Sequence, residues 1–422
     1  MLAVRLVFVG AMLAGRLLAA NEIPPEEYRA RRAALGASLA DGVTVIVGRT
    51  SREAEELRSG FIQEANFLYL TGWREPGAIL MLTPPAGETL FLPARDSSRE
   101  KYYGRGASAL DRNIGALTGF DQVLEAESFE ARLSQALDAH RKVYTLSDGI
   151  AGERLKSMLS PREVADASAA IGRLRLKKSP REVALIRGSL EATIQAHREA
   201  WKRIRPGLFE YQAAAIIVGS YLGRGCERSA YTPIVASGPN STTLHYSSNR
   251  RRMAAGDLVL IDAGAECSGY AADLTRTVPV SGKFTPRQRQ LYEVVLGAER
   301  AVIQAVKPGM TFSRESPNSL TRIAERYLDA HGKDAKGKPL GRYLNHLVGH
   351  HVGLEVHDAG QLATSGPLEP GMVITVEPGI YIEDEGIGIR IEDMVLVTQK
   401  GAEVLTISLP KAPGEIEKAL SR

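Results

Sequence analysis

The sequence has 422 residues, more than one hydrophobic core ordinarily serves, so it predicts two domains. Its 44% hydrophobic and 24% charged residues are typical of a globular protein. The formal net charge is only +4, and the basic run at residues 250–252 is short, so the composition argues against a nucleic-acid-binding protein.

Residues 1–20 differ in character from the rest of the chain. Arg5, an apolar stretch at residues 6–14 and small residues at 19–20 are typical of a secretory signal peptide. The apolar stretch is too short to span a bilayer, so we expect no membrane span in the mature chain. We therefore predict export to the periplasm or beyond. Because Arg16 interrupts the apolar stretch, a cytoplasmic protein is the alternative.

The chain contains two cysteines, Cys226 and Cys267, and their spacing does not match a metal-binding pattern. In an exported protein they could pair, but a sequence does not show whether two cysteines are close in space. We expect buried free thiols, with a disulfide as the alternative.

Residues 21–172 alternate between helical and strand-like patterns, which predicts an α/β domain. A turn with two prolines and a glycine at residues 84–87 separates two apolar runs and indicates a hairpin. The expected elements are a helix at 28–39 and strands at 43–47, 78–82 and 89–92.

Two similar helix-start signals follow, at residues 160–163 and 179–182. Each places Ser at the N-cap, Pro at the first helical position and Glu at the third, so each predicts the start of a helix. The charged stretch 173–178 lies between them. We place the domain boundary there, between residues 21–172 and residues 173–422.

The helix predicted after Ser179 carries one apolar face. His197 falls on this face, so we expect a core histidine. Strand-rich segments at 231–277 and 346–404 enclose two helical stretches at 286–306 and 320–331. This order suggests an α+β domain with one antiparallel sheet flanked by helices.

Acidic residues follow apolar strands at several points of this second domain. Asp262 ends the run 258–261, and Asp273 follows a turn at Ser268–Gly269 and precedes another strand. A hairpin of this size can bring the two carboxylates together. Glu377 ends a run in the same way. A buried carboxylate is costly unless it is paired or bound to a cation; backbone amides are the alternative partners.

The fourth acid, Glu392, belongs to the segment 386–393. In a strand, Arg390 and Glu392 point to the same face. Arg390 would then either form an ion pair with Glu392 or contact a substrate.

Four of the eight histidines lie within residues 346–357. Gly349 and Gly353 allow close backbone approach around His350. Neutral imidazole is the commonest metal ligand and carries protons near neutral pH, so this cluster predicts a site of metal or proton chemistry.

The charges of these groups indicate how many ions they hold. Two aspartates and two glutamates supply four negative charges, which two divalent cations would match. Oxygen ligands with one imidazole favour Mn²⁺, with Co²⁺ or Zn²⁺ as alternatives. A paired-ion site activates a bridging water and stabilises a tetrahedral intermediate, which is hydrolytic chemistry.

This ligand set resembles that of the creatinase/methionine-aminopeptidase superfamily, which has the pita-bread fold, and most resembles that of its Xaa-Pro aminopeptidases. The likeness covers nearly all of the chain after residue 20. Besides the blocks above, it rests on segments 67–72, 231–238 and 244–246. It implies a C-terminal pita-bread domain, with an antiparallel sheet flanked by helices, after a smaller α/β creatinase-like N-terminal domain.

The resemblance implies a role for each ligand. Asp262 would bind one ion through both oxygens, and Asp273 and Glu392 would bridge the two ions. His350 and Glu377 would complete the shell of the second ion. Glu377 would also accept the proton of the attacking water, as a general base.

The resemblance also implies residues that contact the substrate. His245 would lie at the scissile bond, and His346 and His357 would line the site as hydrogen-bond or proton partners. His245, His357 and Arg390 are the expected substrate contacts. No role follows for His351, which we expect to be structural.

The implied reaction is release of the N-terminal residue from peptides with proline in second position. A prolidase, which cleaves Xaa-Pro dipeptides, is the first alternative, and a metal-free binding protein of the same fold is the second. The resemblance alone carries the expectation of a homo-oligomer.

Overall fold

The computed structural model describes residues 23–50, 60–85, 87–146, 155, 159, 162–360 and 366–421. The predicted signal peptide at residues 1–20 lies outside these residues. The chain divides into two compact units, of which the first ends at Arg175 and the second begins at Leu176. Within the described ranges, no helix combines the length and apolar character needed to cross a membrane.

The first unit contains a six-stranded mixed sheet in the order β4-β3-β2-β1-β5-β6. Strands β1, β2 and β3 pair antiparallel, and the other neighbours pair parallel. The strands are β1 (Gly42–Val47), β2 (Ile79–Thr83), β3 (Gly87–Leu92), β4 (Gln122–Glu125), β5 (Lys142–Thr145) and β6 (Glu163–Asp166). The described helices are α2 (Pro25–Ser38), α4 (Ala65–Thr71), α5 (Ser97–Tyr103), α6 (Ile114–Thr118), α7 (Phe129–Ala139) and α9 (Ser168–Leu176).

Most predicted elements of this unit are confirmed. The helix at 28–39 is α2, and the three predicted strands are β1, β2 and β3. The predicted hairpin joins β2 to β3, with Thr83 opposite Gly87. Val43, Val45 and Phe91 are fully buried in the core cluster of this unit.

The helix start predicted at residues 160–163 is wrong. Glu163 begins β6, which pairs parallel with β5 through Tyr144 and Ala165, whereas Ser160 and Pro161 lie outside the described residues. Pairing with a neighbouring strand outweighs a local capping pattern, because it satisfies the whole segment's backbone groups. The first unit ends at Arg175, which lies inside the charged stretch 173–178 where the boundary is predicted, near the end of α9.

The helix start predicted at residues 179–182 is confirmed. Ser179 Oγ accepts a hydrogen bond from Glu182 N at 3.2 Å, and Glu182 Oε2 accepts one from Ser179 N at 2.9 Å, so a capping box starts α10. The two helical stretches predicted at 286–306 and 320–331 are α12 and α13. The helices are α10 (Pro180–Trp201), α11 (Glu210–Gly223), α12 (Pro286–Ala305), α13 (Leu320–His331) and α15 (Pro413–Leu420).

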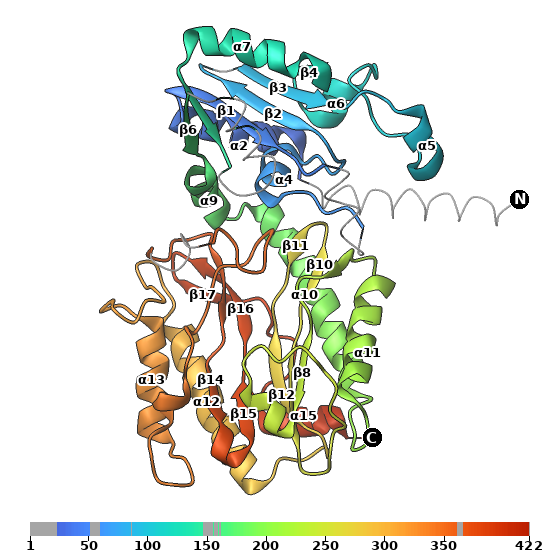
Figure 1. Ribbon diagram of the computed structural model, residues 1–422. Helices are drawn as coiled ribbons and strands as arrows, with labels where there is room; N and C mark the ends of the chain where they lie inside the picture. The colour runs from blue at the N-terminus through green and yellow to red at the C-terminus, as the bar shows by residue number, and fades with distance from the viewer. Residues whose placement is uncertain are drawn as a thin grey trace, which may run out of the picture. The chain divides into compact units, whose positions relative to one another are not determined.

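The strands of the second unit pair antiparallel, as predicted for this α+β domain, but they form four small ladders instead of one sheet. Figure 1 shows strands of this unit between the helix pairs α10/α11 and α12/α13. The ladders run β11-β10-β7, β12-β9-β8, β13-β16-β17 and β14-β15. Their strands are β7 (Arg228–Ser229), β8 (Ile234–Ser237), β9 (Leu258–Asp262), β10 (Ala265–Cys267), β11 (Tyr270–Ala271), β12 (Thr275–Pro279), β13 (Val373–Val376), β14 (Gly379–Ile382), β15 (Ile387–Arg390), β16 (Asp393–Thr398) and β17 (Gly401–Val404).

His197 is a core residue of α10, as predicted. Its side chain is fully buried, and its ring meets the Trp201 ring edge to face at 6.5 Å between centroids. Burial, and then the positive charge of Arg276, lower the pKa of His197 from 6.5 to about 4. The imidazole is therefore neutral in the folded protein at pH 7.

We expect the free energy of unfolding to fall as the pH drops from about 6.5 to about 4. Over this range the unfolded chain binds a proton at His197 and the folded chain does not, which corresponds to about 3 kcal/mol. His197→Gln removes the titrating ring and should lose this part of the slope. Urea unfolding of both proteins at pH 4.5 and 7 measures it, and equal pH slopes would contradict the assignment.

Cys226 and Cys267 form a disulfide, so the expectation of free thiols is wrong. They are 41 residues apart in sequence, and the pairing of β7 with β10, with Arg228 opposite Glu266, brings them together. Only the folded chain reveals this proximity.

Replacing both cysteines by serine should lower the free energy of unfolding by about 4 kcal/mol, because the bridge closes a loop of 41 residues in the unfolded chain. Urea unfolding under oxidising conditions tests this. A thiol reductant should produce the same loss in the wild-type protein and none in the Cys226→Ser/Cys267→Ser variant. Equal free energies of unfolding for the wild type and the variant, both without reductant, would refute this stabilising role of the disulfide.

Candidate active site

A cavity of about 740 Å³ lies within the second unit, and all the residues predicted for the site line it. No residue of this set is left outside the cavity wall. The set comprises the predicted ligands Asp262, Asp273, His350, Glu377 and Glu392, and the predicted substrate or proton partners His245, His346, His357 and Arg390.

Two antiparallel ladders bring the acids to the cavity. Asp262 is the last residue of β9 and lies opposite Thr275 of β12, so the predicted hairpin does bring Asp273 back beside it. Glu377 follows β13 directly, and the backbone N–H of Glu392 donates to Thr275 O at 3.1 Å. The apolar runs before these acids are buried, which fixes each carboxylate at a strand end.

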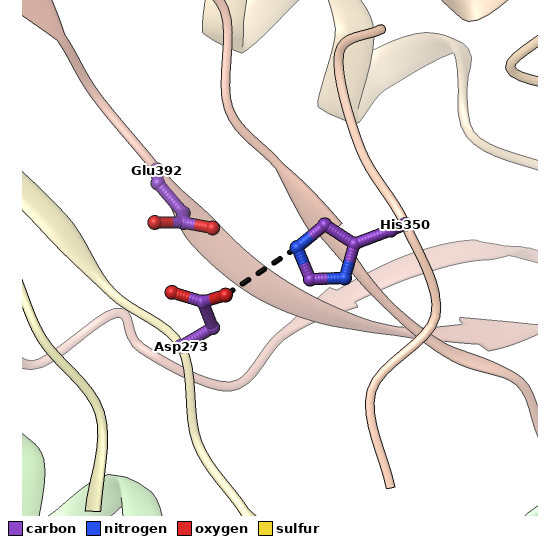
Figure 2. A group of neighbouring side chains, drawn as sticks. All are labelled: Asp273, His350 and Glu392. Carbon is purple, nitrogen blue, oxygen red and sulfur yellow. Dashed lines mark ion pairs between the residues drawn. The ribbon is translucent and has the colours of Figure 1, made fainter. Parts of the chain in front are cut away.

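Asp273, His350 and Glu392 point toward one another from three different segments (Figure 2). One ligand atom from each lies within 4.8 Å of the others. His350 Nε2 is 3.3 Å from Asp273 Oδ2 and 3.5 Å from Glu377 Oε1. His350 Nδ1 lies 3.2 Å from the carbonyl of His351 and therefore carries a proton. With this proton on Nδ1, Nε2 is the ring nitrogen that faces the carboxylates and is placed to bind a cation.

The acids shift one another's proton affinities. Burial, and then the charge of Asp262, raise the pKa of Asp273. Burial, and then the charges of Asp273 and Asp262, raise the pKa of Glu377 to about 7. Burial, and then the charges of Asp273, Glu377 and Asp262, raise the pKa of Glu392 well above its usual range. Burial lowers the pKa of His350, but Asp273 and Glu377 outweigh it and raise the pKa to about 9. The site therefore favours positive charge at its centre.

The donor set fits divalent cations. Buried carboxylates this close are costly unless cations or hydrogen bonds compensate them. The ligand atoms are carboxylate oxygens and one imidazole nitrogen, the donors that hard and borderline ions prefer. Asp273, His350 and Glu392 already lie close enough together for one ion to contact a ligand atom of each.

Arg390 pairs with a different acid from the one predicted. Its Nη2 donates to Asp262 Oδ2 at 2.5 Å, and its Nη1 donates to Tyr381 OH at 2.7 Å. The predicted ion pair with Glu392 is wrong, because β15 lies against β9 and so places the guanidinium at the end of β9. Arg390 is nearly fully buried and also lines the cavity.

His346 is held in one orientation. Its Nδ1 donates to Leu347 O at 2.8 Å, so its Nε2 accepts a hydrogen bond from Tyr381 OH at 2.9 Å. Burial, and then the charge of Arg390, lower the pKa of His346 to about 4, so this ring is neutral at pH 7. Its Nδ1 is 3.9 Å from Glu377 Oε2.

The other histidines differ in their surroundings. The rings of His357 and His350 are 4.2 Å apart between centroids. His245 is exposed on a loop at the cavity wall. His351 also lines the cavity, but it is buried, with its ring edge to face with Phe312 at 6.0 Å.

Several residues that hold the acids were not predicted from the sequence. The single hydroxyl hydrogen of Tyr231 is shared between Asp262 Oδ1, at 2.5 Å, and Asp273 Oδ1. Thr275 Oγ1 donates to Glu392 Oε2 at 2.7 Å, and Thr375 Oγ1 donates to Glu377 Oε1 at 3.2 Å. Tyr231 stands in the quoted segment 231–238, but nothing in that segment indicates which acids its hydroxyl meets.

Burial, and then the charges of Asp262 and Asp273, raise the pKa of Tyr231 well above its usual range. Its hydroxyl therefore stays protonated and continues to donate. This keeps the two aspartates at a fixed separation.

The chain matches two family models. Metallopeptidase family M24 matches residues 184–399, and the aminopeptidase P N-terminal domain matches residues 28–144. The Xaa-Pro aminopeptidase of Escherichia coli (strain K12) is 35% identical over 437 residues, covering 94% of this chain and 98% of that protein.

Solved structures agree with these matches. Proline aminopeptidase P II from Yersinia pestis has a TM-score of 0.84 at 32% identity, covering 94% of this chain and 99% of its own. Zinc-substituted E. coli aminopeptidase P in complex with product has a TM-score of 0.82 at 33% identity, covering 94% and 98%. These matches agree with the two-unit fold and with the acidic cavity described above. The chain belongs to metallopeptidase family M24 and is a metal-dependent aminopeptidase of the aminopeptidase P type.

Proposed function

We propose that Asp262, Asp273, His350, Glu377 and Glu392 hold two divalent cations, with Mn²⁺ the best suited and Co²⁺ or Zn²⁺ as alternatives. The observation that carries this proposal is the convergence of four buried or nearly buried carboxylates and one imidazole on a single cavity wall. Their four negative charges match two divalent cations. Oxygen-rich sites with one imidazole suit Mn²⁺.

When bound, such a pair of cations supplies an activated water and stabilises the charge that develops on the scissile carbonyl. Glu377 accepts a proton at its carboxylate, as a general base. Its Oε1 is fixed by Thr375 Oγ1 at 3.2 Å. Asp273 and Glu392 are fixed in the same way by hydroxyls of Tyr231 and Thr275.

The histidines and Arg390 bind and orient the peptide. A row of hydrogen bonds runs from Asp262 through Arg390 and Tyr381 to His346. It holds the His346 ring neutral and in one orientation beside Glu377, where the ring lines the site. His245 and His357 are exposed side chains on the cavity wall, and they contact the scissile region.

The proposed substrate is a peptide with proline in second position. The E. coli relative described above is named Xaa-Pro aminopeptidase. A proline amide has no N–H, so a site that serves it needs room for the ring and no acceptor for that nitrogen. Apolar side chains of Ile234, Leu244 and Val356 line the cavity beside the acids, and a proline ring would pack on such a surface.

The test is release of the first residue from Xaa-Pro-Yaa tripeptides by the purified protein with added Mn²⁺. The matched Xaa-Ala-Yaa peptides test the requirement for proline, and Xaa-Pro dipeptides test the prolidase alternative. We expect tripeptide cleavage that greatly exceeds cleavage of both controls. No release by protein with bound metal would refute the proposal, and cleavage of dipeptides alone would favour a prolidase.

We also propose that the protein is exported. The disulfide between Cys226 and Cys267 supports this proposal, because such bonds persist in oxidising compartments. N-terminal sequencing of the protein from fractionated cells tests it: a periplasmic or secreted chain that starts near Asn21 is expected. A cytoplasmic chain that retains residues 1–20 would contradict it.

Homo-oligomerisation is a separate proposal, carried by the family resemblance. Light scattering of the purified protein tests it. A mass of one chain, 45.6 kDa or slightly less after processing, would contradict it.

A further inference from the structure

The loop at residues 238–251 forms one wall of the cavity without contributing any of the proposed metal ligands. It follows β8 and begins with the short helix η2 (Gly238–Thr242). Leu244, His245 and Ser247 of this loop line the cavity, and His245 is exposed. An exposed side chain on a loop has little packing of its own, so its position depends on what holds the loop.

A single buried carboxylate holds both ends of this loop. Glu210, the first residue of α11, is fully buried. Its Oε1 accepts hydrogen bonds from Ser237 N and Ser237 Oγ, both at 2.7 Å, and from Asn240 Nδ2 at 3.1 Å. Its Oε2 accepts from Tyr246 OH and Arg251 N, both at 2.8 Å. The donors therefore come from the start and from the end of the loop.

The chemistry of this junction requires a carboxylate. An ionised carboxylate offers only acceptors, about four lone-pair sites in all, and its hydrogen bonds are stronger than those between neutral groups. The position of Glu210 in the first turn of α11 also favours negative charge there. A neutral amide would turn its NH₂ group toward donors and would leave some of them unpaired in a buried place.

The loop is also anchored on either side of His245. Leu244 and Tyr246 pack against an apolar cluster formed by Ile234, Ala236, Leu260 and Tyr381. His245 lies between these two packed side chains and is exposed. The Tyr246 side chain therefore joins three things: the apolar cluster through its ring, Glu210 through its hydroxyl, and His245 through the backbone.

We propose that Glu210, acting through Tyr246, is a positioning residue that fixes His245 at the cavity for the aminopeptidase reaction. The inference rests on the proposed function, and it adds a determinant of catalysis outside the metal site and outside the cavity lining. If the hydroxyl bond is lost, the ring of Tyr246 still packs, but the backbone at His245 gains freedom. Misplacement of a substrate-contacting group by about 1 Å can cost up to about a hundredfold in rate.

The test uses Tyr246→Phe, which keeps the packed ring and removes only the hydroxyl, and Glu210→Gln as the second variant. We expect Tyr246→Phe to lower kcat for an Xaa-Pro-Yaa peptide about tenfold, with the metal content and melting temperature close to those of the wild type. The same substitution in a His245→Ala background should cause no further loss, because the group it positions is gone.

Tyr343→Phe is the matched control. It also removes a tyrosine hydroxyl bond to a carboxylate, from Tyr343 OH to Asp334 Oδ2 at 2.7 Å, but neither residue lines the cavity. Its kcat and KM should equal those of the wild type.

Three results would overturn the inference: unchanged kcat in both Tyr246→Phe and Glu210→Gln, additive losses in the cycle with His245→Ala, or a loss of activity that follows a loss of metal or of melting temperature. The wild-type measurement separates the two proposals. An inactive wild-type protein with bound metal would refute the proposed function as well, whereas an active one with additive losses refutes only the role of Glu210.

Discussion

Replacing Asp273 by asparagine is expected to lower kcat/KM for an Xaa-Pro-Yaa peptide by about a thousandfold or more, and to reduce the metal content of the protein. A loss of this size corresponds to about 4 kcal/mol of transition-state stabilisation, which several polarising interactions of a bound cation can supply. Asp273 faces His350 at 3.3 Å and belongs to the closest ligand group. An amide offers one neutral oxygen where a carboxylate offers two charged ones.

The matched control for this substitution is Asp334→Asn. Asp334 is also buried and accepts hydrogen bonds from Lys336 N, Lys338 N and Tyr343 OH, but it does not line the cavity. The control should lose stability and keep its metal and its kcat/KM. Equal activity of Asp273→Asn and the wild type, with metal retained, would remove Asp273 from the ligand set.

Replacing Glu377 by glutamine should lower kcat by about 10²–10⁴-fold, the range of a lost general base, while KM changes little. Glutamine has the volume of glutamate and keeps one oxygen, but its amide does not accept a proton at neutral pH. Glu377 Oε1 lies 3.5 Å from His350 Nε2 and receives the hydroxyl of Thr375, so its position is fixed independently of substrate. Steady-state kinetics with metal in excess separate kcat from KM.

Glu182→Gln is the control for this second substitution. Glu182 is buried in the capping box of α10, where glutamine serves as well as glutamate, and it does not line the cavity. Its kcat should match the wild type. A Glu377→Gln variant with a kcat within threefold of the control would exclude Glu377 as the base.

The residues that gather at the cavity could be selected from the sequence because the segment around each of them is locally distinctive. An acid after four apolar residues, as at Asp262, must be buried at a strand end, and the structure places it there. The same holds for Glu377 after β13. The capping box at residues 179–182 is equally local, and it predicted where α10 begins.

The features that were not predicted correctly from the sequence depend on neighbours that are distant along the chain. The segment 160–163 has the same capping pattern as 179–182, but Glu163 joins a strand because β5 lies beside it. Arg390 pairs with Asp262, 128 residues away, and not with Glu392 two residues on. Periodicity predicts the face on which a side chain lies, but the partner on that face comes from the tertiary fold.

The same limit applies to the disulfide and to Tyr231. Cys226 and Cys267 are brought together by the ladder of β7 and β10. The hydroxyl of Tyr231 reaches both aspartates because β7 leads directly to it. No spacing rule in the sequence states either contact.

The measurement that tests the central claim most directly is the metal content of the purified protein. After incubation with Mn²⁺ and removal of free ions, elemental analysis should find two ions per chain, together with full aminopeptidase activity. Chelation should remove both ions and the activity, and added Mn²⁺ should restore them together. Full activity in a chain that holds one ion or none would contradict the assignment of Asp262, Asp273, His350, Glu377 and Glu392 as the ligands of an ion pair.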